Sequence, residues 1–505
     1  MRRLLSLLVF ITGCCGIYAQ TYEIGFDAKV LKNYSIFKKG SNVHVDSMKH
    51  ELDFDQSDIP QHSYTLYTSA GSVKVKEKLE KVLDVDYKNA QNFWDAQVIF
   101  NVLEDLTKTG TQEDIRAEME NDVLEYIGRV KRNGGDFNDP FLESYIYSLI
   151  SKLSPDVLID GRPGVVNLLI LSGSTANAFM FPNGTLCITT GLISLLHSED
   201  ELAAILAHEI AHFVLDHSIQ NYNKMKRAQK RAEFWAAFAT ILTGVAEGVA
   251  AAKNPYYKPG LATLAVAVAA SQIASELCKR WGMSYSRKQE SEADDMAKEL
   301  IKVIGYDPNA LSTALSRVEE SMKQERSIEM YFASDHPALI ERIKKAGTPS
   351  KNVDKTFERI ISFAVSDAAT LKMEDRRFRQ ALPLVSQNID NNVGTADDYI
   401  QMANCLLYMK NDAQSNLEVT RLINEAKRIK PQNINIYKTE IIASLRQSKY
   451  SAAGSLLESY RQKLNSMLKY DETIPELEKN RIYNFVQSEL MWADDMAQKL
   501  KAFVK

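Results

Sequence analysis

The sequence predicts an α+β fold that is mostly helical. Apolar residues recur at helical spacing after Ser198 and again after Ser286, which indicates amphipathic helices. Two short apolar segments, Val165–Leu171 and Thr185–Thr190, are typical of strands, and no strand signal follows Gly347. A chain of 505 residues is long enough for about three domains.

Residues 1–19 have the features of an export signal. The charged start Met1–Arg3 precedes the apolar run Leu4–Ile11, which is too short to span a bilayer as a mature helix. The letters IYA predict ordinary cleavage after Ala19, whereas the letters ITGC resemble a bacterial lipobox and would place a lipid on Cys14. We therefore expect an exported protein that is either soluble or lipid-anchored.

Charge and cysteine content exclude two kinds of protein. A formal net charge of -4, from 61 basic and 65 acidic residues, argues against a nucleic-acid-binding surface. The mature chain keeps Cys187, Cys278 and Cys405 without a CxxC pair. We therefore expect neither a disulfide framework nor a zinc site made of thiolates.

Residues 20–115 form a predicted N-terminal segment of unknown role. This segment contains the alternating stretch Tyr64–Tyr67 and is predicted to become helical from Val73. Phe93 and Trp94 follow at helical spacing, and we expect them in a core rather than at a ligand site.

The stretch His208-Glu209-Ile210-Ala211-His212 predicts a metal site on one helix. At about 100° per residue the two histidines lie about 40° apart, so both imidazoles can reach one ion. Zinc suits such ligands, and it lowers the pKa of its bound water toward ~7 while a neighbouring glutamate takes the proton. Ser198 and Glu201 predict a capping box at the start of this helix. The HExxH pattern also occurs by chance on solvated helices, so a third ligand is needed to distinguish a metal site from a chance match.

A third ligand is sought first among histidines and then among carboxylates. His217 lies nine positions after the first histidine and would point about 180° away from it, so we interpret His217 as structural. Further along, Glu290 and Asp294 share one helical face, whereas Glu292 is rotated by about 160° from their midpoint. If one carboxylate binds the metal and another supports the site, the pair is Glu290 and Asp294. An ordinary solvated acidic helix start is the alternative.

Four motifs, in order, resemble one family of zinc metallopeptidases. They are an NAF...TxGL segment from Asn177 to Leu192, HExxH at 208–212, SRxxExEAD at 286–294, and HPxxxxR from His336 to Arg342. The family is metallopeptidase family forty-eight, which contains the CAAX prenyl proteases, the HtpX-type membrane peptidases and the periplasmic barrel-assembly-enhancing proteases. The resemblance covers about residues 120–346. It implies a gluzincin-type peptidase domain at 116–348 that binds one Zn²⁺ ion per chain.

The resemblance also implies roles for single residues. Those expected to hold the metal are His208, His212 and Glu290. Glu209 is the expected catalytic base, and Asp294 is expected to hold a ligand in place. Those expected at a substrate-binding strand are Asn177, Ala178 and Phe179; in a zinc peptidase of this kind a substrate commonly adds to a sheet edge through its main chain. A turn cap is the alternative role for Asn177.

His336 is placed with Glu209 among the expected catalytic residues. As a donor beside the metal it would stabilise the oxyanion that develops on the scissile carbonyl. As a fourth ligand it would instead displace the catalytic water and hold the resting enzyme off. A packing or capping histidine is the third reading, and all three stay open.

An alanine-rich helical hairpin is predicted at 232–276, between the two ligand motifs. Several members of the family have transmembrane helices near this position. Glu247 interrupts the first half, and the second half is also short of the ~20 apolar residues that a span requires. We expect packing of small-residue helices, with contact to a membrane surface as the alternative.

Residues 349–505 predict an all-α domain of tetratricopeptide-like repeats. Pieces of the repeat pattern occur at 375–382, 426–431 and 448–452, although the period is degenerate. Such arrays bind extended partners on a concave surface. We expect this domain to recruit protein substrates or the outer-membrane assembly machinery; a helical lid over the peptidase is the alternative.

Together these features predict a zinc endopeptidase of the cell envelope. Its expected location is the periplasm or the periplasmic face of the outer membrane, and its expected substrates are misfolded or misassembled envelope proteins. The competing class is a non-proteolytic chaperone or scaffold with a structural zinc site. The intact Glu209 favours the enzyme, because a structural site needs no base.

Overall fold

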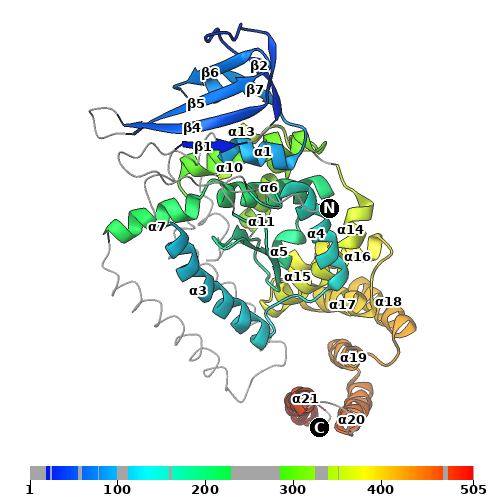
Figure 1. Cartoon of the computed structure of the whole chain (residues 1–505). Helices are drawn as coiled ribbons and strands as arrows, with labels where there is room; N and C mark the ends of the chain where they lie inside the picture. The colour runs from blue at the N-terminus through cyan, green and yellow to red at the C-terminus, as the bar shows by residue number, and fades with distance from the viewer. Residues whose placement is uncertain are drawn as a thin grey trace. The chain divides into compact units, whose positions relative to one another are not determined.

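The computed structural model describes residues 19–22, 25–54, 60–77, 79–98, 112–158, 162–228, 285–324, 339–350, 352–469 and 476–503. Helices dominate this part of the chain and are accompanied by three small sheets, which confirms the predicted α+β, mostly helical class (Figure 1). The chain divides into two compact units, one of residues 1–112 with 155–164 and one of residues 113–154 with 165–505. The predicted domain boundaries near 115 and 348 stay predictions.

The first unit is built from two antiparallel sheets. One has the order β1 (Ala19–Tyr22), β4 (Ser47–Phe54), β5 (Pro60–Thr68) and β6 (Gly71–Val75); the other has the order β3 (Asn42–Val45), β2 (Phe26–Val30) and β7 (Leu83–Asp86). A short 3₁₀ turn, η1 (Leu79–Lys81), and the helix α1 (Ala90–Gln97) complete the unit.

Strand β6 corrects the prediction of helix from Val73. Val73 and Val75 are buried while Lys74 is exposed, which is the period of two that a strand requires. Five residues are too few for periodicity to separate a strand from a helix start. The aromatic pair on α1 is in the core as predicted, since Phe93 is 1% and Trp94 0% exposed.

The second unit begins with helices and a three-stranded sheet. Its first elements are α3 (Gln112–Asn133), α4 (Pro140–Leu153), β8 (Asn167–Leu171), β9 (Ala178–Met180), β10 (Thr185–Thr189) and α5 (Thr190–Ile193). Strand β10 lies in the middle, parallel to β8 and antiparallel to β9, with Leu186 opposite Met180. All five residues of β10 are buried, as its apolar sequence requires. Strand β9 is therefore an edge of this sheet.

The helices of the metal motifs pack together beside the sheet. They are α6 (Glu199–Val214), α7 (His217–Ala228), α10 (Arg287–Val303), α11 (Ala310–Gln324) and α13 (Leu339–Ala346). Helix α6 contacts α10, α11 and β9, and α13 contacts both α10 and α11. Every residue of α6 from Glu201 to Val214 is buried, so this helix is the centre of the packing.

A purely helical segment follows, as predicted. It consists of α14 (Lys355–Ile360), α15 (Ser362–Glu374), α16 (Phe378–Asp390), α17 (Ala396–Met409), α18 (Ala413–Ile429), α19 (Asn435–Arg446), α20 (Tyr450–Met467) and α21 (Glu476–Phe503). From α15 onward each helix packs against the next one in sequence. Arg376, Asn392 and Ser448 take positive φ angles of 57° to 60° where helices end, which reverses the chain direction.

Several predicted features lie outside the described residues. These are the export signal with Cys14, the hairpin at 232–276, Cys278 and His336. Within the described ranges, no helix combines the length and the apolar character that crossing a membrane would require. Cys187 and Cys405 are buried free thiols.

Candidate metal centre

Helix α6 is well capped, although by a different arrangement from the predicted box. The Ser198 hydroxyl accepts a hydrogen bond from the backbone N–H of Glu201 at 3.2 Å. The Glu201 carboxylate does not return to Ser198; it accepts from the backbone N–H of His197 at 3.1 Å and is held by Arg317 at 2.8 Å. The cap fixes the start of α6, and Arg317 ties that start to α11.

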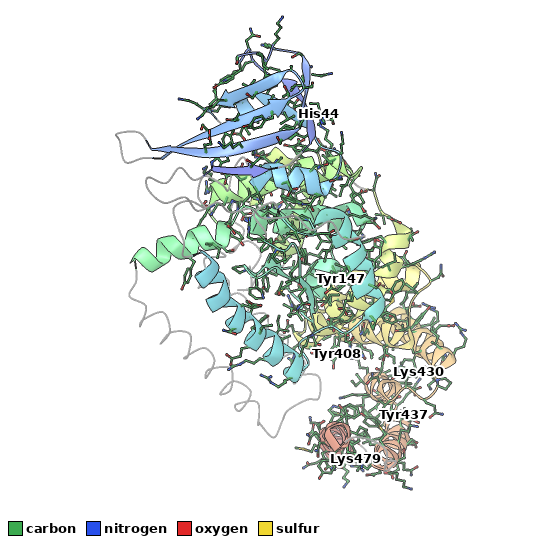
Figure 2. The ribbon with its side chains drawn as sticks, in the orientation of Figure 1. His44, Tyr147, Tyr408, Lys430, Tyr437 and Lys479 are labelled. Atoms are coloured by element: carbon green, nitrogen blue, oxygen red, sulfur yellow. The ribbon has the colours of Figure 1, made fainter. Side chains whose placement is uncertain are left out.

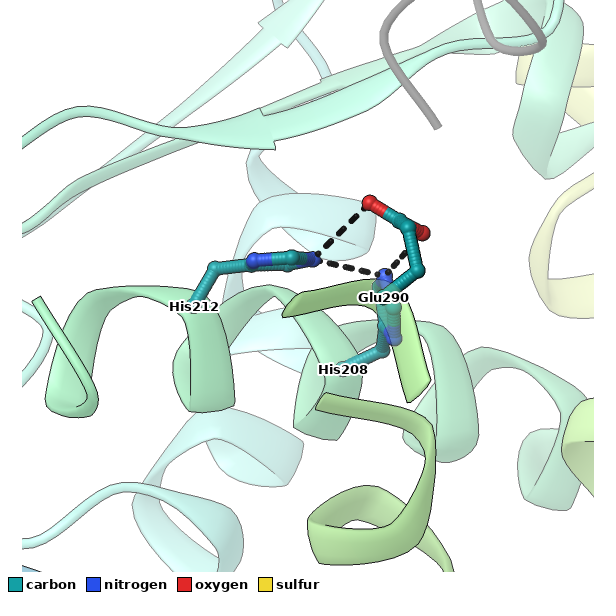
Figure 3. Close-up of side chains that lie close together, drawn as sticks. All are labelled: His208, His212 and Glu290. Carbon is teal, nitrogen blue, oxygen red and sulfur yellow. Dashed lines mark hydrogen bonds and ion pairs between the residues drawn. The ribbon is translucent and has the colours of Figure 1, made fainter. Parts of the chain in front are cut away.

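His208, His212 and Glu290 converge on one point (Figure 3). The Nε2 atoms of the two histidines are 3.1 Å apart, and Glu290 places Oε1 3.4 Å from His212 and Oε2 3.6 Å from His208. None of the three residues is more than 1% exposed. Among the described residues this is the cluster of His, Cys, Asp and Glu that could hold a metal ion. Two imidazoles and one carboxylate are a donor set that suits zinc with an open position.

His208 is held by a buried carboxylate–guanidinium pair. Its Nδ1 lies 2.9 Å from Oδ1 of Asp294, on the side of the ring opposite the cluster. Arg342 of α13 grips Asp294 with two hydrogen bonds of 2.8 and 2.7 Å and contacts Oε2 of Glu290 at 2.5 Å. Burial alone would raise the pKa of Asp294, but Arg342 and His208 lower it below its ordinary value. Glu290 thus turns Oε1 toward His212, while its Oε2 contacts Arg342 and lies 3.6 Å from His208.

His212 is held by a second histidine and an aromatic ring. Its Nδ1 lies 2.8 Å from Nδ1 of His217, and the Tyr285 ring stacks on it with centroids 3.6 Å apart. The far nitrogen of His217, Nε2, is 3.5 Å from Oε2 of Glu292. Burial lowers the pKa of both His208 and His212 and so favours the neutral rings, the form that binds a metal.

The position of His217 shows where the helical-wheel argument stopped being valid. The prediction that His217 points away from the first histidine assumed one continuous helix. The helix ends at Val214 with Leu215 as its C-cap, and Asp216 takes a φ of 58°, which turns the chain before α7 begins. His217 therefore meets the outer edge of His212 and lies outside the metal cluster. Nothing in the sequence marks this break, because Asp216 is neither glycine nor followed by proline.

Glu209 and Glu292 occupy contrasting environments. Glu209 is fully buried on α6. Burial raises the pKa of the Cys187 thiol on β10, and the charge of Glu209 raises it further. Glu209 is therefore close enough to β10 for its charge to act on this thiol. The Glu292 side chain is 41% exposed and is paired with His217 and Lys288 rather than with the cluster. These positions agree with the predicted helical phase of α10.

The predicted substrate residues lie at and before the edge strand. Asn177 is 3% exposed, and its Oδ1 has no hydrogen-bond partner within the described ranges. Its backbone is fixed by β10, since its N–H donates to Oγ1 of Thr189 at 3.0 Å and its C=O accepts from the N–H of Thr189 at 3.0 Å. The Ala178 and Phe179 side chains are buried, and Phe179 packs edge-on against Phe181. A ligand would meet this strand through main-chain atoms.

Comparison with known proteins identifies the domain. Residues 142–350 match the family described as Peptidase family M48. The chain is 31% identical over 180 residues to the mitochondrial metalloendopeptidase OMA1 of Schizosaccharomyces pombe, which covers 35% of this chain and 44% of that protein. It is 26% identical over 214 residues to the beta-barrel assembly-enhancing protease of Escherichia coli K12, covering 42% and 39%. It is 26% identical over 184 residues to the metalloprotease LoiP of the same organism, covering 36% and 62%.

The chain thus contains a metallopeptidase domain of family M48, which confirms the resemblance seen in the four motifs. Each of these matches spans less than two thirds of the relative's own length. The domain is followed by the helical segment from α14 to α21.

Proposed function

We propose that this chain is a zinc-dependent endopeptidase of the cell envelope. The observation that carries the proposal is the buried convergence of His208, His212 and Glu290, with Glu209 beside them on α6. A purely structural site would need no buried carboxylate next to the ligands, and it commonly has four protein ligands rather than three.

In this proposal His208 and His212 would bind zinc through Nε2 and Glu290 would bind it through its carboxylate. The ion would polarise the scissile carbonyl and lower the pKa of the attacking water. Glu209 holds that water and takes its proton, and then passes the proton to the leaving amine. The Arg342 guanidinium contacts the carboxylates of both Asp294 and Glu290, and Asp294 in turn contacts His208. These contacts keep His208 and Glu290 in their places.

The peptide substrate would add to the sheet at β9. This strand is an edge, it contacts α6, and its side chains are buried, so its main chain is what it offers to a substrate. The buried Oδ1 of Asn177 would accept a hydrogen bond from the bound peptide. Asn177, Ala178 and Phe179 are therefore proposed to set the register of the scissile bond.

The helical segment would receive an extended part of the protein substrate or a partner in the assembly of outer-membrane proteins. Helices α15, α17, α19 and α21 line a groove of about 1430 Å³ with Phe363, Tyr408, Trp492 and Lys430 among its residues; Tyr408 and Lys430 are labelled in Figure 2. Phe363 is 57% and Tyr408 51% exposed, so both aromatic rings are accessible to a ligand in this groove.

The biological role is proposed from residues and relatives together. The charged and apolar start of the chain favours export, with cleavage after Ala19 or lipidation of Cys14. Some relatives are named beta-barrel assembly-enhancing proteases, which supports a role in the assembly of β-barrel proteins. We propose that this chain acts in the periplasm on misfolded or misassembled envelope proteins.

The Glu209→Gln variant tests the proposal. Glutamine keeps the shape of the side chain but cannot take a proton, so zinc should stay bound at one ion per chain while cleavage of an unfolded outer-membrane protein falls by at least ~10²-fold. Zinc is measured by elemental analysis and cleavage by electrophoresis. Equal cleavage by the two proteins would refute the enzyme. A wild-type chain that holds zinc, prevents aggregation and cuts nothing would favour the chaperone or scaffold.

A further inference from the structure

The buried ring of His217 has no role in the steps described above. It is 2% exposed, it lies outside the metal cluster, and its two nitrogens face two different side chains. Nδ1 lies 2.8 Å from Nδ1 of His212, and Nε2 lies 3.5 Å from Oε2 of Glu292. A buried histidine between a metal ligand and a carboxylate is well placed to set which nitrogen of that ligand carries the proton.

The tautomers of both rings follow from the contacts. A neutral His212 that presents the lone pair of Nε2 to a metal carries its proton on Nδ1, so this Nδ1–H donates. Nδ1 of His217 must then be the acceptor, and the proton of His217 is on Nε2, facing Glu292. The Nδ1–H of His212 thus donates to His217, and the Nε2–H of His217 faces the carboxylate of Glu292.

Helix α10 holds His217 by its backbone as well as by its ring. The side chain of Gln289 donates to the backbone C=O of His217 at 3.4 Å and exchanges hydrogen bonds with Asn221. Gln289 precedes the ligand Glu290 directly in sequence. The element that supplies the third ligand therefore also fixes the residue that orients the second one.

We propose that His217 is the positioning residue of the metal centre, which accepts the Nδ1–H of His212 and so keeps Nε2 of His212 unprotonated and aimed at the ion. This inference rests on the proposed zinc site. His208 is supported by the buried carboxylate of Asp294 and, behind it, by Arg342. His212 would be supported in the same way by His217 and, behind it, by the partly exposed carboxylate of Glu292.

Two amide variants separate the hydrogen bond from mere packing. In His217→Asn the amide oxygen can occupy the place of Nδ1 and still accept from His212. In His217→Gln the same group lies one carbon further out, near the place of Nε2, and leaves the His212 proton unpaired. Both variants lose the ring to a similar degree, so a role in packing alone would affect them alike.

The measurement is zinc affinity by competition with a chromophoric chelator, on the full mature chain, together with the visible spectrum of the cobalt-substituted protein. We expect His217→Gln to bind zinc about 10- to 100-fold more weakly than wild type and to change the cobalt spectrum. We expect His217→Asn to recover most of that loss. Unfolding of the metal-free proteins, followed by circular dichroism, reports folding separately.

Three results would overturn the inference. Wild-type affinity and spectrum in His217→Gln would show that His217 does not position His212. Equal losses in the two variants would assign His217 to packing. A wild-type chain that binds no zinc would refute both the proposed function and this inference. The first two results, in contrast, would refute the role of His217 and leave the proposed function standing.

Discussion

Glu290 and Glu292 lie two positions apart on α10 yet have different surroundings. Glu290 is 0% exposed among two histidines and Arg342, whereas the Glu292 side chain is 41% exposed and pairs with His217 and Lys288. One residue faces the proposed metal and the other faces the helix surface. This contrast makes the pair a sharp test of which carboxylate is a ligand.

Glu290→Gln should weaken zinc binding by more than the ~10- to 100-fold that loss of a supporting residue costs, and it should abolish turnover. Glu292→Gln should leave zinc in place, because the amide oxygen can still accept from Nε2 of His217. Zinc content after dialysis and peptide cleavage measure the two effects. The reverse pattern would mean that the assignment of faces on α10 is wrong.

Glu374, at the end of α15, carries a strongly shifted carboxyl group. Burial, with smaller contributions from Asp367 and Asp375, raises the pKa of Glu374 to about 8. Its Oε2 is buried with no hydrogen-bond partner in the described part of the chain. The folded state therefore holds this proton more tightly than the unfolded chain, whose carboxyl has a pKa of about 4.3. The free energy of unfolding must then fall as pH rises from about 4.3 to 8, as this proton is lost.

Glu374→Gln cannot ionise and should remove that part of the decline. We expect the two proteins to unfold at similar temperatures at pH 5 and the variant to unfold at the higher temperature at pH 8. Thermal unfolding measured at half-unit steps of pH gives the difference curve, which contains the titration of Glu374 together with its coupling to Asp367 and Asp375. Parallel curves would show that Glu374 is ionised in the folded protein.

The junction between β10 and α5 depends on a glycine. A Cβ at Gly191 would lie 2.5 Å from the backbone oxygen of Thr175 and 2.6 Å from that of Gly173. Residues 173–175 lead into β9. The Thr190 hydroxyl holds them in place by accepting a hydrogen bond from the N–H of Gly173 at 3.0 Å. Helix α15 also contacts this junction: the Asp367 carboxylate accepts hydrogen bonds from the hydroxyls of Ser172 and Thr190 at 2.8 and 2.7 Å.

Gly191→Ala should therefore lower the free energy of unfolding by about 1–3 kcal/mol and reduce peptide cleavage, because the backbone before the edge strand must move. Gly454→Ala is the matched control. Gly454 lies within α20, and a methyl group added there would meet nothing within 4 Å, so this alanine should raise stability by about 0.5–1 kcal/mol through helix propensity. Thermal unfolding of both variants checks the pair; a neutral Gly191→Ala would contradict the close approach.

The same elements show how far local signals reach. Helices α6 and α10 are capped by Ser198 and Ser286, and in each a capping serine precedes an apolar period, so their presence and phase could be predicted. That phase separates Glu290 from Glu292 and brings Asp294 to His208. The contacts that cross between distant segments, such as Arg342 with Glu290, have no local signal beyond the resemblance in their motif.

Two failures have a common cause, which is that periodicity needs an unbroken element of sufficient length. The helical phase of His217 was wrong because the chain breaks at Asp216, and helix from Val73 was wrong because a strand of five residues ends before its period is evident. In both cases tertiary packing, rather than local preference, decides the backbone.

At the scale of the whole molecule, the metal centre joins helices that are distant in sequence. Its proposed ligands come from α6 and α10, and the groups that contact these ligands come from α7, α10 and α13. An ion that binds only when these helices are packed stabilises their unit by about 2.7 kcal/mol when its free concentration is 100 times Kd. Among the described residues of the N-terminal unit, no comparable cluster occurs.

Chelation should therefore separate the unfolding of the two units. In differential scanning calorimetry of the wild-type chain, EDTA should lower the transition temperature of the unit that contains α6 and α10 by several degrees, since about 2.7 kcal/mol is a large fraction of a domain's stability. The transition of the N-terminal unit should stay where it was. Glu290→Gln provides the control, because a chain that cannot hold the ion has no bound-state stability to lose and should melt at the same temperature with and without EDTA. An equal shift in wild type and Glu290→Gln would show that EDTA acts at a place other than the cluster of His208, His212 and Glu290. A metal bound at this cluster would then not stabilise the packing of these helices.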